Sequence, residues 1–270
     1  MNRVRLAACF GAMGAFIAGG WGHAAAPSPV QILQFKPRQE GVQPSQPKPG
    51  EESACKVELV KGTGKGSGWI LRDGSGQILR RFFDTNDDNK IDVWSYYREG
   101  QEIYREIDTN HNSIADQFRW VNAGGARWGV DTNEDGTIDS WQLLSPAAAS
   151  PEMVRAIATN NAARFRALVL TDADLKQMDL GGEVARSFKE KAAGAVGRFQ
   201  AAVTKLEGAK PSWLHLELGS PQCLPTDATG SRFDLIRHPR GTILVDLGGK
   251  TEWLQSGEMV QVGAAWKLVE

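Results

Sequence analysis

Cysteine is scarce in this chain, whose 270 residues include only three, Cys9, Cys55 and Cys223. None of them forms a Cys-x-x-Cys pair, so the sequence implies no thiol redox centre. The four histidines include no pair with the spacing of a zinc site, and the chain has no nucleophile elbow. Because none of these catalytic patterns is present, we expect a protein that is not an enzyme.

Charge of one sign is also lacking over the whole chain, whose formal net charge is −1. This balance argues against a nucleic-acid partner, because binding to phosphates requires a basic surface. It hides a local excess of acid, since residues 84–139 contain 13 Asp or Glu and five Lys or Arg. Bound cations would relieve the repulsion within that region.

Long hydrophobic runs are missing beyond the first 24 residues. A basic start precedes an apolar run over residues 6–20, and small residues follow at Gly22, Ala24, Ala25 and Ala26. This order is typical of a secretory signal peptide, and we expect residues 1–24 to be removed by cleavage after Ala24. The mature protein is expected in the periplasm, at the cell surface or outside the cell, without a membrane span.

Removal of the signal peptide leaves Cys55 and Cys223, and an even pair in an oxidising compartment favours a disulfide. Such a bridge would close a long loop and typically adds about 2–4 kcal/mol of stability. Two free thiols are the alternative, because sequence alone does not bring two sulfur atoms together.

Proline is concentrated in residues 25–54, which hold six of the 12 prolines. This composition buries too little apolar surface to fold alone, and we expect an extended, Pro-rich linker. The segment Val30–Phe35 is more apolar, and we expect it to dock as a strand.

One short pattern is repeated three times between Asp84 and Trp141. The copies begin at Asp84, Asp108 and Asp131, 24 and then 23 positions apart, as in an array of one supersecondary unit. Each copy has oxygen-bearing side chains at its positions 1, 3, 5 and 9, as a hard cation requires of a surrounding loop. The candidate metal ligands are Asp84, Asn86, Asp88 and Asp92 in the first copy, Asp108, Asn110, Asn112 and Asp116 in the second, and Asp131, Asn133, Asp135 and Asp139 in the third.

The three copies differ in strength. The middle copy supplies only two carboxylates, so we expect it to be the weakest site. The third copy has Gly136 at the sixth position, where a calcium loop turns sharply. With three carboxylates or fewer in each loop, we expect weak Ca²⁺ binding, with dissociation constants on the order of 10⁻⁴ to 10⁻³ M.

This spacing resembles the Asp-rich loops of thrombospondin type 3 repeats and the first nine positions of an EF-hand loop. The resemblance implies Ca²⁺ as the bound ion. An EF-hand also places a bidentate Glu at position 12, where this chain has Ser95, Arg119 and Gln142. The flanking helices of an EF-hand are likewise missing from the sequence pattern.

Turn formation is the alternative interpretation of the three copies. Asp and Asn side chains accept hydrogen bonds from the backbone two residues on, and they tolerate left-handed conformations. Turn formation alone does not explain why Asp recurs at both the first and the ninth position. Both interpretations therefore stay open at the level of the sequence.

Around these loops, apolar and polar residues alternate in runs that are rich in aromatic and β-branched residues. Each run predicts a strand, and glycine-rich turns alternate with the Asp loops between successive strands. We therefore expect a β-repeat domain over residues 55–145, an antiparallel meander with all three loops at one edge. Its predicted strands are Gly68–Arg72, Gln77–Phe83, Val93–Tyr97, Glu102–Ile107, Gln117–Val121, Ala126–Val130 and Ser140–Leu144.

An aromatic residue stands two positions after the ninth residue of each copy, at Trp94, Phe118 and Trp141. Such residues are usually buried, and we interpret them as core. An exposed stripe that stacks on sugars is the alternative.

The composition changes after residue 145, and residues 146–270 predict an α+β domain of helices followed by an antiparallel sheet. Helix starts are expected at Ser150, after Asn160 or Asn161, and at the capping box that begins with Thr171. A longer helix is expected over Glu183–Leu206. The predicted strands are Trp213–Leu218, Phe233–Ile236, Thr242–Asp246, Thr251–Leu254, Met259–Val262 and Ala265–Val269.

This second domain is similar to the cone-shaped α+β roll of nuclear-transport-factor-like and ketosteroid-isomerase-like domains, notably over Ala158–Leu168 and Val262–Leu268. The resemblance implies a cone that can hold a ligand. It supplies no catalytic Asp and Tyr pair, because the chain has no tyrosine after Tyr104.

Taken whole, the chain resembles exported bacterial proteins that combine Asp-Thr-Asn-x-Asp repeats with such a C-terminal domain. We expect an exported, non-enzymatic, calcium-binding structural or interaction module, whose partner would be another exported protein or a cell-surface component. The alternative is a small-ligand-binding or enzymatic C-terminal roll with the repeats as scaffold. The candidate polar residues of that alternative are His215, Glu217, Asp234, Arg237 and His238.

Overall fold

The computed structural model describes residues 26–122, 125–180, 182–206 and 208–270. The predicted signal peptide, residues 1–24, lies outside these ranges. Within them, no helix combines the length and the apolar character that crossing a bilayer requires.

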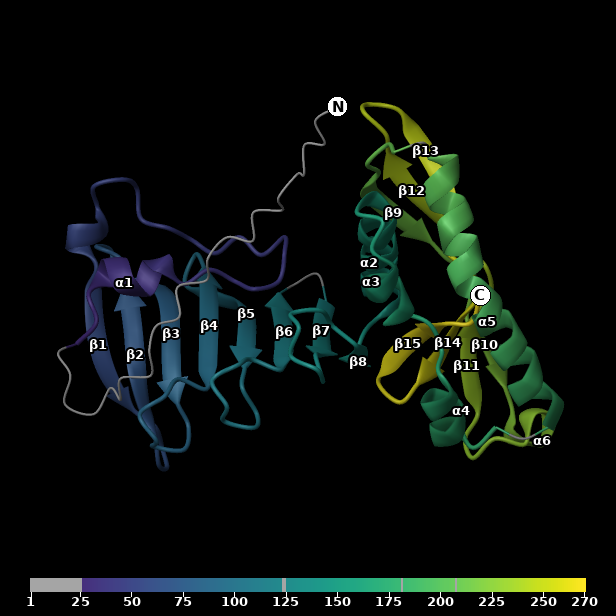
Figure 1. The fold of residues 1–270 in the computed structure, drawn as a ribbon, viewed down its shortest axis with the longest axis horizontal. Coiled ribbons are helices and arrows are strands. Elements are labelled where there is room, and N and C mark those ends of the chain that lie inside the picture. The colour runs from purple at the N-terminus through teal and green to yellow at the C-terminus, as the bar shows by residue number, and fades with distance from the viewer. Residues whose placement is uncertain (1–25, 123–124, 181, 207) are drawn as a thin grey trace, which may run out of the picture.

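An eight-stranded antiparallel meander forms the first half of the described chain, and each strand pairs with the next along the sequence (Figure 1). The predicted meander is confirmed. It has one strand more than expected, because β1 is a mostly exposed edge strand without a clear apolar alternation. The strands are β1 (Lys56–Lys61), β2 (Ser67–Arg72), β3 (Ile78–Asp84), β4 (Val93–Arg98), β5 (Gln101–Ile107), β6 (Gln117–Asn122), β7 (Gly125–Val130) and β8 (Ser140–Leu143).

A row of aromatic rings crosses one face of the meander from strand to strand. The rings belong to Phe82, Tyr96, Tyr104, Trp120 and Trp141, and neighbouring centroids lie 5.1 to 6.2 Å apart. All five side chains are buried. Such cross-strand aromatic pairs stabilise a sheet and fix its register.

The aromatics that follow the Asp loops belong mainly to the core. Phe118 and Trp141 are buried, which confirms the core interpretation for these two, whereas Trp94 is half-buried. A flat, solvent-facing stripe for sugars is therefore not formed by these residues.

The Pro-rich segment packs along one face of the meander (Figure 1). The strand expected over Val30–Phe35 is wrong: Pro29–Gln34 forms helix α1 instead, because Ser28 and Gln31 make a reciprocal capping box before a proline-started turn. Ile32 is buried against the sheet. A short 3₁₀ helix over Glu52–Ala54 leads into β1.

Four helices begin the second half: α2 (Pro146–Ala158), α3 (Ala162–Arg166), α4 (Asp172–Met178) and α5 (Gly182–Lys205). The helix expected from Ser150 begins earlier, because Ser145 caps it and Pro146 takes the first helical position. The cap at Asn161 and the capping box at Thr171 are confirmed.

Two small antiparallel sheets complete the second half, so the α+β class is confirmed. One has the strand order β10, β11, β14, β15, and the other has the order β13, β12, β9. The three-residue strand β10 was not expected from the sequence. The remaining elements are β9 (Ser212–Glu217), β10 (Gln222–Leu224), α6 (Thr226–Thr229), β11 (Leu235–His238), β12 (Thr242–Asp246), β13 (Thr251–Gln255), β14 (Met259–Val262) and β15 (Ala265–Leu268).

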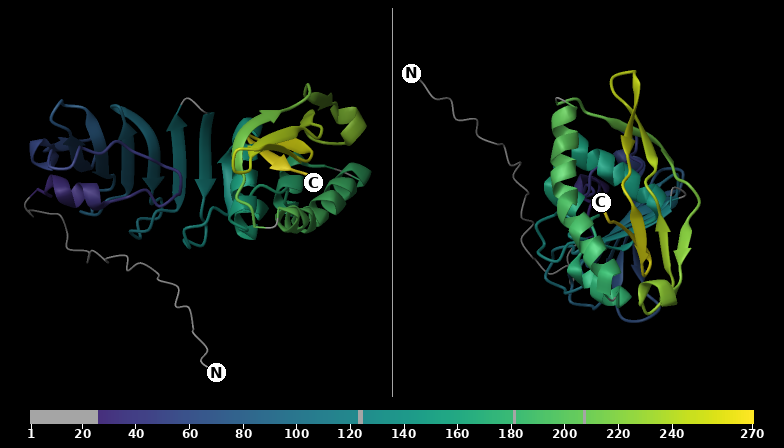
Figure 2. Two further views of the ribbon diagram at one scale, coloured as in Figure 1. Left: turned by 90° about the horizontal axis from the view of Figure 1, so that it is seen from above. Right: turned by 90° about the vertical axis from the view of Figure 1, so that its right-hand side faces the viewer.

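The two halves lie end to end and share one hydrophobic core (Figure 2). Leu144 is fully buried where they meet, and its backbone forms a parallel bridge to Ala265. The same core cluster contains Trp141 of the meander, Val154 of α2 and Phe199 of α5. The meander therefore packs directly against the helices that follow it.

The predicted disulfide between Cys55 and Cys223 is not formed, and both cysteines are free. Cys55 is buried beside β1 at one end of the molecule, in a core cluster with Leu71 and Leu79. Cys223 is exposed on β10 in the other half. The sulfur atoms do not meet because the two segments belong to opposite ends of the fold (Figure 1).

Candidate functional site

The three Asp-rich loops lie at the same end of the meander, as the sequence predicts. The first loop, residues 84–92, joins β3 to β4; the second, residues 108–116, joins β5 to β6; and the third, residues 131–139, joins β7 to β8. Alternate connections of a meander share one edge, and the loops stand side by side there (Figure 1). The spacing of 24 and 23 residues thus corresponds to one hairpin plus one loop.

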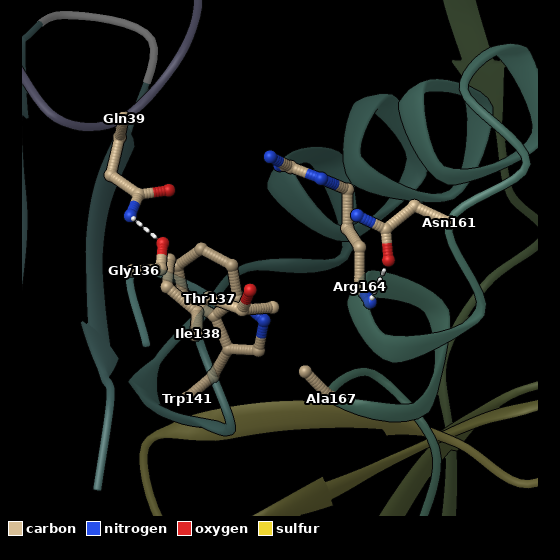
Figure 3. A pocket seen from close by; sticks show the side chains of 8 residues that line it. All are labelled: Gln39, Gly136, Thr137, Ile138, Trp141, Asn161, Arg164 and Ala167. Carbon is tan, nitrogen blue, oxygen red and sulfur yellow. Dashed lines mark hydrogen bonds between the residues drawn. The ribbon is translucent and has the colours of Figure 1, made fainter. Parts of the chain in front are cut away.

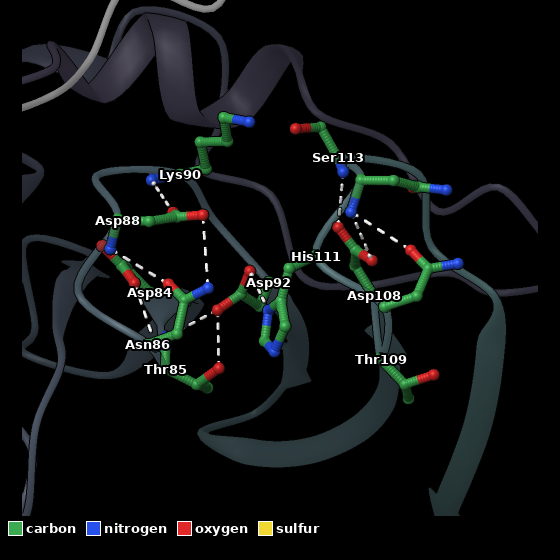
Figure 4. A network of polar contacts seen from close by, with 12 residues as sticks. Asp84, Thr85, Asn86, Asp88, Lys90, Asp92, Asp108, Thr109, His111 and Ser113 are labelled. Carbon is green, nitrogen blue, oxygen red and sulfur yellow. Dashed lines mark hydrogen bonds and ion pairs between the residues drawn. The ribbon is translucent and has the colours of Figure 1, made fainter.

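Hydrogen bonds inside each loop repeat the same pattern (Figure 4). The Oδ2 atom of the Asp at position 1 accepts from the backbone N–H of position 6, at 2.7, 2.6 and 2.8 Å in the three loops. The Oδ1 atom of the Asn at position 3 accepts from the N–H of position 5, at 3.0, 3.1 and 3.1 Å. These bonds orient the side chains toward the inside of each loop.

The last part of each loop is fixed in the same way. The Oδ1 atom at position 5 accepts from the N–H of position 7, at 2.9, 2.8 and 2.8 Å. The Oδ2 atom of the Asp at position 9 accepts from the N–H of position 2, at 2.7, 3.1 and 2.8 Å. The recurrence of Asp at the first and ninth positions therefore has a structural role, since both residues tie the two ends of the loop.

Left-handed backbone occurs at positions 4 and 6 of every loop. The φ angles are 66° and 67° at Asp87 and Asn89, 61° and 75° at His111 and Ser113, and 60° and 88° at Glu134 and Gly136. Asn, Asp and Gly adopt this conformation more easily than other residues. The sixth position holds Asn in the first loop, Ser in the second and Gly in the third. Glycine adopts the left-handed conformation with the least strain, and only the third loop has it there.

The carboxylates at position 1 and most of those at position 9 are buried, whereas positions 3 and 5 are exposed. Asp84, Asp92, Asp108, Asp116 and Asp131 all have less than a tenth of their surface exposed. Asp139 of the third loop is exposed. In each loop, therefore, the side chains at positions 3 and 5 are exposed, and the carboxylate at position 1 is buried.

The ionisation of these carboxylates depends on their hydrogen bonds. Burial raises the pKa of Asp131, and repulsion from Asp135 adds to the increase against the hydrogen bond from Gly136. Burial also opposes ionisation of Asp92, but hydrogen bonds from Thr85 and His111 bring its pKa below the ordinary value. A cation beside Asp131 would favour its charged form.

Neighbouring loops contact one another. The backbone N–H of Asp108 donates to the Asp92 carbonyl at 2.8 Å, and that of Asp131 donates to the Asp116 carbonyl at 2.9 Å. His111, at position 4 of the second loop, places Nδ1 3.1 Å from Oδ1 of Asp92 (Figure 4). The three loops therefore form one continuous acidic edge instead of separate turns.

Glu134 is a residue of this edge that the sequence interpretation missed. It stands at position 4 of the third loop, and its carboxylate accepts hydrogen bonds from the side-chain amides of Asn110 and Asn112 in the second loop at 2.7 Å. Position 4 of a later loop thus faces the preceding loop, as it does at His111. Glu134 brings a third carboxylate to the middle loop, which has only two of its own.

One carboxylate oxygen in the second loop has no partner. Oδ1 of Asp116 is buried and makes no hydrogen bond, while Oδ2 accepts from Thr109. A buried carboxylate oxygen usually has a donor, an ordered water or a cation beside it.

Carboxylates alone do not make a complete metal cage at this edge. In the part of the chain that the structure describes, no group of three or more His, Cys, Asp or Glu side chains is arranged to hold a metal ion. A cation in these loops would also need the Asn oxygens at position 3 and the backbone carbonyl at position 7. The observed hydrogen bonds are those of the turn interpretation, and they are compatible with both.

The polar residues proposed for a ligand-binding C-terminal roll do not come together. His215 is exposed on β9, and Nδ1 of His238 lies 3.1 Å from the Gly219 carbonyl oxygen. Arg237 pairs with Glu258 at 2.8 Å and lines a surface hollow without the other candidates, while Asp234 accepts from the backbone of Thr226. No observation favours a catalytic site among these residues.

Comparison with known proteins gives no further guide, because no family model, curated protein or solved structure matches this chain.

Proposed function

We propose that this protein is an exported, non-enzymatic structural or interaction module whose three Asp-rich loops bind Ca²⁺. The observation that carries the proposal is the repetition of one hydrogen-bond pattern in all three loops, on one edge of a rigid sheet. That pattern orients oxygen atoms in the same way in each loop. A partner would be another exported protein or a cell-surface component that meets this edge.

The hydrogen bonds that orient the Asp side chains leave oxygen lone pairs free to bind a cation. A carboxylate oxygen has two lone pairs, so an Asp that accepts one N–H at each oxygen keeps the capacity to bind a metal ion. Asp131 is such a residue, with one N–H at Oδ1 and one at Oδ2. The proposed ligands of the third loop are Asp131, Asn133, Asp135 and the Thr137 carbonyl, with Asp139 direct or through water.

The electrostatics of the edge favour a divalent cation. Residues 84–139 carry an excess of eight negative charges, and five of the six carboxylates at positions 1 and 9 are buried. The unpartnered Oδ1 of Asp116 adds an acceptor that a cation would satisfy. Neutralisation of this repulsion would stabilise the folded chain.

In the middle loop we propose that Glu134 completes the ligand set of Asp108, Asn110, Asn112 and Asp116. Its carboxylate is already held beside Asn112 at 2.7 and 2.8 Å. If the Glu134 carboxylate exchanged one of its hydrogen bonds with Asn112 for a bound ion, it would become a ligand of the middle loop. The second and third sites would then be coupled.

We propose further that the Asp loops are thrombospondin type 3-like and that the C-terminal half is a cone-like roll of the nuclear-transport-factor type. Both assignments rest on the sequence resemblance alone. In this view the C-terminal half anchors the meander through the shared core around Leu144.

Thermal unfolding with and without Ca²⁺ tests the proposal. At 10 mM Ca²⁺ and a dissociation constant of about 1 mM, each site adds about 1.4 kcal/mol, which raises Tm by roughly 3–6 °C. Replacement of Asp88 and Asp135 by Asn removes a ligand charge from two loops and keeps an oxygen that accepts from position 7. The increase should fall by about two thirds in this double variant.

The matched control is Asp87→Asn, which removes the same charge from the same loop at a position that is not a proposed ligand. This control should keep the full Ca²⁺-dependent increase in Tm. The single variant Asp88→Asn is compared with this control. If both lose the same part of the Ca²⁺-dependent increase in Tm, Ca²⁺ acts only by screening charge. No increase in the parent protein would support the turn interpretation.

A further inference from the structure

Three arginines converge on one buried carboxylate where the two halves of the molecule meet. Arg155 and Arg164 donate to Glu152 at 2.8 and 2.6 Å, and Arg127 of β7 forms a third ion pair with it. The Glu152 side chain is only 2% exposed, and the three arginine side chains are between 17% and 31% exposed. In the described chain no other acidic group pairs with these arginines, so two positive charges remain in excess.

The excess charge is held in place by packing. The Arg127 guanidinium lies over the Trp120 ring at 4.3 Å, and a Cβ on Gly41 would meet the Arg155 guanidinium at 3.0 Å. Burial lowers the pKa of Arg127, and repulsion from Arg155 and Arg164 adds to this decrease against the attraction of Glu152. These contacts restrict the positions of the Arg127 and Arg155 side chains, unlike those of a mobile surface arginine.

A hollow adjoins this cluster, between the third Asp loop and α3 (Figure 3). Its volume is about 50 Å³. One ordered water needs roughly 10–15 Å³ by the same measure. The space therefore admits roughly three to five waters or one small polyatomic ion.

Trp141, Asn161 and Arg164 bring donors to the hollow, and the Gln39 side-chain oxygen is an acceptor at its border (Figure 3). Trp141 is 5% exposed, and its Nε1–H makes no hydrogen bond. Oδ1 of Asn161 accepts from the Arg164 backbone at 2.9 Å, so its Nδ2 is the atom that faces inward (Figure 3). Arg164 reaches Glu152 through Nη1, which leaves its other N–H groups for a ligand.

The Pro-rich segment closes the remaining side. Nε2 of Gln39 donates to the Gly136 carbonyl at 2.9 Å, and Gln39 is 6% exposed. This contact ties the N-terminal segment to the third Asp loop beside the hollow. The hollow is thus built from three separate segments of the chain.

We propose that this hollow is a binding site for a small oxyanion of about the size of phosphate. Its ligand would accept hydrogen bonds from Trp141 Nε1, Asn161 Nδ2 and Arg164, and it would balance the positive excess around Glu152. Neutral water would satisfy the donors but not the charge. A carboxylate group has the same acceptor chemistry, and the experiment distinguishes a planar from a tetrahedral ion.

Nuclear magnetic resonance of the indole N–H groups provides the direct test. The ¹⁵N-labelled protein is titrated with inorganic phosphate in calcium-free buffer, with NaCl adjusted to hold the ionic strength constant. The Trp141 signal, assigned by Trp141→Phe, should move in a saturable manner. A parallel titration with acetate shows whether a planar carboxylate is sufficient.

Variants separate this site from general charge effects. Arg164→Gln should weaken phosphate binding at least tenfold, whereas Arg232→Gln, the same change at an exposed arginine, should leave it unaltered. The proposal is overturned if the Trp141 signal does not saturate with phosphate, or if saturation survives in Arg164→Gln. Should Arg164→Gln not fold, calorimetry on Trp141→Phe decides: a several-fold weaker phosphate affinity supports the site, and an unchanged affinity overturns it.

Discussion

The Glu134 carboxylate of the third Asp loop lies 2.7 and 2.8 Å from the Asn112 side-chain amide in the second loop. This contact joins the third loop, which has three carboxylates at its ligand positions, to the middle loop, which has two. It also explains how a loop with two carboxylates of its own could hold a divalent cation.

Glu134→Gln should selectively weaken Ca²⁺ binding to the middle loop. The remaining amide oxygen can still accept from Asn110 and Asn112, while one charge and one of the two acceptor oxygens are lost. Calorimetric titration should then show one site fewer, with the first and third sites unchanged. A uniform decrease over all sites would mean that Glu134 acts only through long-range charge.

Glu106 makes the stability of the fold dependent on pH. Its Oε1 accepts from the Arg38 backbone at 2.5 Å, yet burial raises its pKa from 4.5 to about 7. The folded state therefore binds a proton that the unfolded state has already released. Stability should fall as pH rises from about 4.5 to about 7, by up to roughly 3 kcal/mol.

Glu106→Gln should remove this fall, and it should make the protein more stable than the parent above pH 7. Urea unfolding at pH 5 and at pH 8 measures the difference. Glu58→Gln, at a half-exposed position on β1, is the control and should leave the pH dependence as it is. An equal effect of the two substitutions would contradict the assignment to Glu106.

Glu152→Gln should be strongly destabilising, because it leaves three neighbouring arginines without their shared carboxylate. Removal of one partner from a buried ion pair typically costs about 3–5 kcal/mol. Denaturant unfolding gives the value directly. Glu252→Gln, which breaks an exposed pair with Lys250, should be far less destabilising.

The two cysteines beyond the predicted signal peptide should behave as separate thiols. Cys223 is exposed and should react rapidly with a thiol reagent in the folded protein. Cys55 is buried, and burial raises the pKa of its thiol, so it should react only when the protein unfolds. Absence of free thiol in the unfolded, unreduced protein would contradict the structure.

The meander could be predicted from the sequence because its alternation and its repeat agree on the same strands. Strand β1 (Lys56–Lys61) was not predicted, because an exposed edge strand needs no alternation of apolar and polar residues. Helix α1 was predicted as a strand, although Ser28, Pro29 and Gln31 carry the signal of a capping box. The capping residues favoured a helix, although the short apolar run Val30–Phe35 is also compatible with a strand.

The contacts between loops could not be predicted, because they depend on which loops stand side by side. Glu134 and His111 have no special position within a single loop, and they matter only once adjacent hairpins align. The cluster of Arg127, Arg155 and Arg164 likewise comes from three elements that only the packing of the two halves brings together.

Calorimetric titration of Ca²⁺ into the parent protein is the most direct test of the proposed function. We predict saturable binding with dissociation constants on the order of 10⁻⁴ to 10⁻³ M. Mg²⁺ at the same ionic strength should give a much smaller signal, because it demands a rigid octahedral shell. A flat titration with Ca²⁺ up to 10 mM would contradict the proposal and leave the loops as turns alone.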